Sequence, residues 1–145
     1  MFLRAFSIDY CRKKRYNFTM KTTSEIYAER LNDPGLRETA ERLVMRAGVS
    51  AKYKGAHTLA DTIILYGTDA SHKFCTLYKI VAECRGLKFK TVMREIDYAI
   101  TQSRELPVRL SVMIGTPIYE EDIHSGLVIS YLGMMLKNPT ISLYS

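Results

Sequence analysis

The stretch that decides the fold runs from Leu77 to Ile100 and reads LYKIVAECRGLKFKTVMREIDYAI. Its apolar residues recur every three or four positions on both sides of Gly86, which is the pattern of two amphipathic helices. Gly86 is placed to end the first helix, and the residues after it leave room only for a short turn. The spacing therefore predicts a helix-turn-helix, in which the first helix braces a second helix whose outer face is free for a partner.

Signals for further helices continue along the chain before this stretch. Asp33 followed by Pro34 predicts an N-cap and a first helical residue, and Gly48 is placed to stop that helix. Thr58 and Asp61 have the spacing of a capping box, which predicts that the next helix begins near Thr58. Period-2 alternation is scarce, so the fold class that we expect is all-α.

Three other segments complete this description. Residues 49–55 are predicted to form a loop that ends in a tight turn, because Gly55 permits a positive φ. Residues 108–119 are short and mixed, and a last helix is predicted over 122–136. We therefore expect a helical domain of roughly six helices over residues 22–145, preceded by a basic N-terminal arm over 1–21 that carries the run Arg12-Lys-Lys-Arg15.

Composition narrows the class of partner. The chain has 145 residues, the length of about one domain, and 21 Lys and Arg against 15 Asp and Glu give a net charge of +6. A basic balance favours an anionic partner, namely nucleic acid, a membrane surface or an acidic protein. No apolar run approaches the roughly 18–20 residues of a membrane span, and the N-terminus lacks the pattern of a signal peptide. We expect a cytoplasmic protein, without a membrane partner, whose three cysteines are reduced.

The second helix of the helix-turn-helix carries the candidate binding residues. Its inward face is predicted to hold Val92, Ile96, Ala99 and Ile100, which leaves Tyr98 among the outward residues. An outward Arg94 can donate to both O6 and N7 of a guanine, while a carboxylate can accept from cytosine and an apolar side chain can contact a thymine methyl. The predicted base-reading residues are Met93, Arg94, Asp97 and Thr101. The predicted phosphate contacts are Lys52, Lys54, Lys73, Lys79, Lys88 and Lys90.

From about residue 36 to residue 136, the chain resembles the C-terminal effector domain of the stage-zero sporulation protein A family of response regulators. The shared marks are the turn 47–55 (AGVSAKYKG), the pairs Leu77-Tyr78 and Val81-Ala82, the pattern Val92-x-Arg94-x-Ile96-x-x-Ala99-Ile100, and Ser103-Arg104 after it. The resemblance implies a six-helix, helix-turn-helix DNA-binding domain without a cofactor. It also implies that the domain forms a homodimer on tandem or paired double-stranded DNA sites and regulates transcription in sporulation, and that its last helices contribute to the dimer.

The chain departs from the family in two respects. The family's recognition helix reads Glu-Arg-x-x-Arg, and here only Arg94 is retained, with Met93 and Asp97 at the other two positions. We therefore expect a different DNA site. Residues 1–35 are too few for the receiver domain of a response regulator, so we expect no phosphorelay switch within this chain. A second interpretation stays open, namely a protein-interaction module that forms a heterodimer with a related regulator and blocks it without reading DNA.

Catalysis and metal binding have little support in the sequence. The chain contains no Gly-x-Ser-x-Gly, no phosphate-binding glycine loop and no His-Glu-x-x-His. His72, Cys75 and Cys84 lack the fourth ligand of a structural zinc site, and both cysteines fall near the apolar faces of their helix. We expect neither an enzyme nor a bound metal or cofactor.

Overall fold

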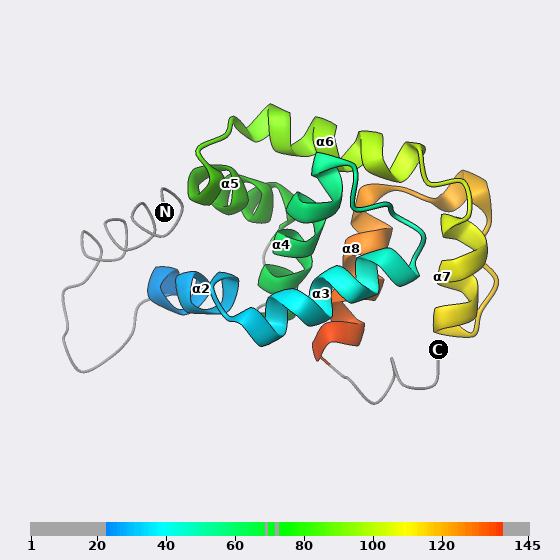
Figure 1. The fold of residues 1–145 in the computed structure, drawn as a ribbon, viewed down its shortest axis with the longest axis horizontal. Coiled ribbons are helices and arrows are strands. Elements are labelled where there is room, and N and C mark those ends of the chain that lie inside the picture. Colours follow the sequence, from blue (N-terminus) through cyan, green and yellow to red (C-terminus); the bar gives the residue numbers. More distant parts are fainter. Residues whose placement is uncertain (1–22, 69, 72, 138–145) are drawn as a thin grey trace.

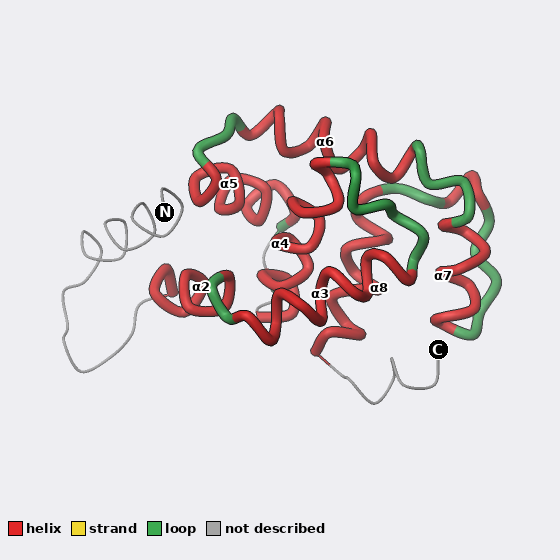
Figure 2. The backbone as a smooth tube through the Cα atoms, viewed as in Figure 1, coloured by secondary structure: helices red, strands yellow, loops and turns green. Residues whose placement is uncertain are grey.

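The computed structural model describes residues 23–68, 70–71 and 73–137, so the predicted arm over 1–21 and His72 lie outside the described residues. Within these ranges the chain forms seven α-helices and no strand, which confirms the predicted all-α fold (Figure 1; Figure 2). None of these helices combines the length and the apolar character that a membrane crossing requires. The elements are α2 (Thr23–Leu31), α3 (Pro34–Arg46), α4 (Lys54–Thr68), α5 (Phe74–Arg85), α6 (Phe89–Thr101), α7 (Leu106–Ile114), the 3₁₀ turn η1 (Glu120–Asp122) and α8 (Ser125–Lys137).

The predicted ends of α3 and α5 follow local chemistry. The Asp33 side chain accepts hydrogen bonds from the backbone N–H groups of Gly35, at 2.9 Å, and Leu36, which caps α3 at its N-terminus. Gly48 lies just after α3 with a φ of 97°, and Gly86 follows α5 with a φ of 66°. These are left-handed conformations that glycine adopts at little cost, so both glycines end their helices as predicted.

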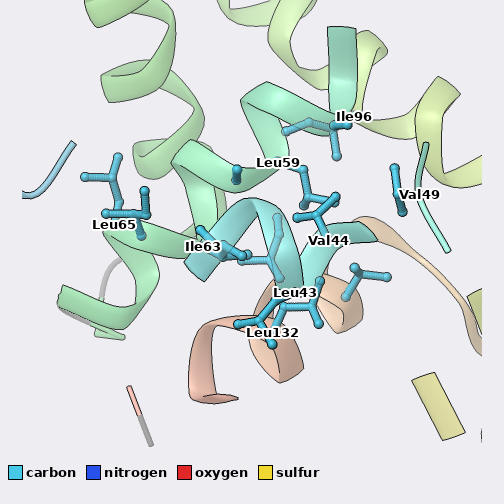
Figure 3. Packing of buried hydrophobic residues seen from close by; sticks show 14 of the residues in the cluster. Leu43, Val44, Val49, Leu59, Ile63, Leu65, Ile96 and Leu132 are labelled. Carbon is cyan, nitrogen blue, oxygen red and sulfur yellow. The ribbon is translucent and has the colours of Figure 1, made fainter. Parts of the chain in front are cut away.

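Helix α4 is the centre of the fold. It packs against α2, α3, α5, α6 and α8, and almost every residue from Gly55 to Leu65 is buried. A helix that is apolar on all sides is stable only when other elements cover it completely. Figure 3 shows Leu59 and Ile63 of α4 among buried side chains of the neighbouring helices, including Leu43 of α3 and Leu132 of α8.

The predicted start of this helix near Thr58 is wrong. Helix α4 begins at Lys54, and Thr58 and Asp61 are both only 2% exposed inside it. The Asp61 carboxylate accepts hydrogen bonds from Arg37 of α3 and Arg85 of α5. Burial lowers the pKa of Arg85 and is the largest single effect, but the hydrogen bond to Asp61 and the negative charges of Asp61, Glu95 and Glu41 together outweigh it, so the net pKa is raised. Asp61 is therefore the acidic centre of an ionic cluster that joins α3 and α5 to α4.

The predicted turn at Gly55 is also wrong, because this glycine lies in the first turn of α4 and its φ is not positive. A Cβ atom at this position would lie 1.9 Å from the backbone oxygen of Glu95 and 2.8 Å from Cβ of Ala99. Gly55 therefore allows α4 to lie directly against the backbone of α6.

The segment predicted as short and mixed contains a helix that the sequence analysis missed. Helix α7 has proline in its first turn, at Pro107, where a missing N–H breaks no helical hydrogen bond. Leu106, Leu110 and Met113 face the core, whereas Val108 is 68% exposed on the other side of the helix. Helix α8 begins later than predicted, because the acidic residues before it form the separate turn η1.

Candidate nucleic-acid interface

Helices α5 and α6 form the predicted helix-turn-helix. After Gly86, the backbone N–H of Leu87 donates to the carbonyl of Ala82 at 2.8 Å, which closes the end of α5. The rings of Tyr78 and Phe89 lie 6.3 Å apart and pack the two helices together. Figure 1 shows α6 running along one edge of the molecule, with α5 beneath its N-terminal end. The turn thus places α6 at the surface, with α5 as its brace.

The inward face of α6 is the one that the sequence predicts. Val92, Ile96 and Ala99 are fully buried, and Ile100 is nearly so. Helix α6 packs against α4, α5 and α8. This burial fixes the rotation of α6 about its axis and determines which side chains face outward.

The predicted base-reading residues do not all share this outer face. Arg94, Asp97 and Thr101 are exposed, whereas Met93 is half-buried and packs against the core. Arg94 makes no ion pair with any residue that the structure describes. Its guanidinium is therefore available to an external acceptor, and Met93 has the least free surface of the four.

The six lysines predicted to contact phosphate are all exposed, and all of them except Lys73 lie beside one end of α6 or its second half. Lys88 and Lys90 lie at the start of α6, where the N-cap residue makes no side-chain hydrogen bond to the first backbone N–H groups. The Lys79 ammonium lies 5.9 Å from the Phe89 ring centroid, at the same end, and Lys73 directly precedes α5. Lys52 and Lys54 lie at the start of α4, close to the second half of α6. Positive side chains beside a helix N-terminus favour a phosphate there.

An aromatic pair that the sequence analysis did not identify extends the outer face of α6. The rings of Tyr53 and Tyr98 meet edge to face, with centroids 5.6 Å apart, and the Lys52 ammonium lies 5.2 Å from the Tyr53 centroid. Tyr98 is still 57% exposed. It follows Arg94 by four residues, so the two share one stripe of α6. The outward position of Tyr98 was predicted, but its contact with Tyr53 depends on tertiary packing.

Tyr78 connects the bracing helix to α8. Its hydroxyl donates a hydrogen bond to Oγ of Ser125 at 3.1 Å. Burial raises the pKa of Tyr78, the Ser125 hydrogen bond opposes the rise, and the nearby Asp97 carboxylate adds to it, so that the net pKa is above its ordinary value. Tyr78 is therefore a buried side chain, neutral at ordinary pH, that joins α5 to α8.

The cysteines of α5 differ from each other. Cys84 is buried as predicted, but Cys75 is exposed, so its predicted place near the apolar face is wrong. Among the residues that the structure describes, no three His, Cys, Asp or Glu side chains are grouped so that they could hold a metal ion.

Comparison of the chain with models of protein families, with curated proteins and with solved structures gives no match. The arrangement of α5, α6 and the turns beside them is thus the basis for a functional assignment. It offers an exposed helix whose Arg94 makes no ion pair within the described part of the chain, an exposed tyrosine, and lysines toward both of its ends.

Proposed function

We propose that this chain is a cytoplasmic, sequence-specific DNA-binding protein that regulates transcription, with α6 as the helix that enters the major groove. The observation that carries the proposal is the outer face of α6, on which Arg94 is exposed and makes no ion pair with the described residues. The opposite face is held by the core, so α6 would meet the DNA as a rigid element. A single exposed helix is the element that helix-turn-helix proteins place in the major groove.

Affinity and sequence choice would come from different side chains. The lysines at both ends of α6 would neutralise phosphates, which supplies salt-sensitive binding to any duplex. Arg94 would determine the sequence preference at one base pair, because bidentate donation to guanine favours it over another base by about 1–3 kcal/mol of binding free energy.

Selection from a randomised duplex pool tests the proposal. An enriched motif, with affinity that falls steeply as salt rises, would support it. Arg94→Ala should then weaken binding to the enriched site by about 1–3 kcal/mol and relax the preference at one position. Arg42→Ala is the matched control, since Arg42 is exposed on α3 and pairs with Glu38. Equal losses on all DNA sequences would contradict base reading by Arg94.

We infer further that the protein binds DNA as a homodimer, as in the family that it resembles. The described surface carries large exposed apolar side chains outside α6, including Val108 and Val112 of α7 and Met134 of α8. Sedimentation of the complex on the enriched site should give two chains per site. One chain per site would contradict the dimer.

One observation favours a second function, that of a protein-interaction module. Asp97 is exposed on the outer face of α6, where its negative charge would repel a phosphate. On α7, the side chains of Val108 and Val112 are 68% and 67% exposed. Such a chain would pair with a related, receiver-bearing regulator and block it. A heterodimer in sedimentation that Val112→Asp abolishes, together with no motif from the duplex pool, would favour this function over DNA reading.

A further inference from the structure

A groove of about 560 Å³ lies beside the C-terminal end of α6. One wall is the turn 48–52, between α3 and α4, and the other is the turn 102–105, between α6 and α7. We propose that this groove holds the phosphodiester backbone of a DNA strand, next to the major groove that α6 enters. The proposal rests on the DNA-binding function proposed above and adds Arg104 and Arg109 to the contact surface.

The charge of the groove favours an anion. Lys52, Arg104 and Arg109 line it, against the single acidic residue Glu105, which accepts a hydrogen bond from Nε of Arg109 at 3.0 Å. The net charge of these four side chains is thus +2. Arg104 is exposed and makes no ion pair with the described part of the chain, so it is the groove's most available donor. Arginine binds phosphate with two parallel N–H donors.

The walls of the groove are fixed before any ligand binds. A Cβ at Gly48 would lie 3.2 Å from Cδ of Arg109 and 3.5 Å from the backbone nitrogen of Leu106, so the two walls are in close contact at their base. On the other side, Ser103 is buried and its hydroxyl donates to the carbonyl of Ala99 at 2.6 Å, which anchors the turn 102–105 to α6. A preformed site loses less conformational entropy on binding than a flexible one.

The groove is also continuous with the stripe of α6 that would read bases. Arg94, Tyr98 and Gln102 follow one another at four-residue spacing, and Gln102 lines the groove. At 1.5 Å per residue, Gln102 lies about 12 Å along the axis from Arg94. The major groove of B-DNA is about 12 Å wide. If Arg94 contacts bases in it, the protein groove at the end of α6 is brought to the phosphates at the edge of the major groove.

The salt dependence of duplex binding tests the assignment. Arg104→Gln should reduce the slope of log affinity against log salt by about one and weaken binding about eight-fold at 0.1 M salt, on all duplexes alike. Lys52→Gln combined with Arg104→Gln should reduce the slope by about two. The matched control is Arg30→Gln on α2, since Arg30 is exposed and lies beyond the opposite end of α3 from the groove. This control should keep the wild-type slope.

The outcomes separate this inference from the proposed function. An enriched motif together with unchanged slopes in both groove variants would overturn the groove and leave the function standing. Salt-sensitive binding that depends on Arg104, without any enriched motif, would support the groove and contradict sequence reading. No binding to any duplex would overturn both. Binding of inorganic pyrophosphate that depends on Arg104, with unchanged duplex affinity, would assign the groove to free phosphates and overturn the DNA assignment.

Discussion

Replacing Gly55 with alanine tests how tightly α4 and α6 are packed. The added Cβ would lie 1.9 Å from the Glu95 backbone oxygen and 2.5 Å from its carbonyl carbon. Contact between such atoms is favourable only from about 3.5 Å, so the two backbones would have to separate by about 1.5 Å. No rotamer change relieves this contact, because the opposing atoms belong to the backbone.

The expected cost follows from two opposing terms. Overpacking of a close contact costs about 1–3 kcal/mol, whereas alanine is favoured over glycine in a helix by about 0.5–1 kcal/mol. Because a backbone must move, we expect a net loss of about 2 kcal/mol in the free energy of unfolding. For a chain of this length, that loss lowers Tm by about 4–8 °C.

Thermal unfolding followed by circular dichroism measures this loss, with Gly35→Ala as the matched control. Gly35 lies in the first turn of α3, where an added Cβ meets only Oδ1 of Asp33 at 3.4 Å. The control should therefore keep or raise Tm. If Gly55→Ala raised Tm as the control does, the close approach of α4 to α6 would be refuted.

Three further perturbations address other parts of the molecule. Asp61→Asn should lower the free energy of unfolding, measured in urea, by about 3 kcal/mol, because it leaves two half-buried arginines without their carboxylate. The control Glu38→Gln, which removes the charge of an exposed ion pair, should change that free energy by less than about 1 kcal/mol. Wild-type stability should fall as the pH rises above about 10, because the raised pKa of Tyr78 means that the folded state holds this proton more tightly than the unfolded chain. Tyr78→Phe should flatten that pH dependence and lose about 1 kcal/mol at neutral pH with the Ser125 hydrogen bond; an equally steep fall in the variant would exclude Tyr78 as its source. Lys79→Gln should lower the salt slope of duplex binding by about one, and an unchanged slope would remove Lys79 from the phosphate contacts.

The features that the sequence predicted correctly are those with a local cause. A cap such as Asp33 or a stop such as Gly86 depends on its own backbone conformation and its nearest neighbours, so its residue type is informative by itself. The inward face of α6 was predictable for the same reason, since an amphipathic helix buries its apolar stripe.

The errors arise where a tertiary contact overrides a local pattern. Thr58 and Asp61 have capping-box spacing, but Asp61 is buried because arginines from two other helices neutralise it. Gly55 is a glycine because of a backbone that lies forty residues away in the sequence. The Tyr53–Tyr98 pair and the groove near Arg104 bring together segments that no spacing rule relates. The outward residues of α6 and single lysines on the neighbouring turns were therefore predictable, whereas the contacts that bring those turns together beside α6 were not.

The all-round burial of α4 has a consequence for how the molecule comes apart. Helices α2 and α3, which precede it, cover only part of its surface, and α5, α6 and α8, which follow it, cover the rest. In a fragment that ends after α4, apolar side chains would be exposed along the whole length of α4. A fragment that begins at α5 would lack α4, the helix against which its own helices pack. The intact chain is thus expected to unfold in one all-or-none transition. If the two fragments are prepared separately, each is expected to fold only after they are mixed.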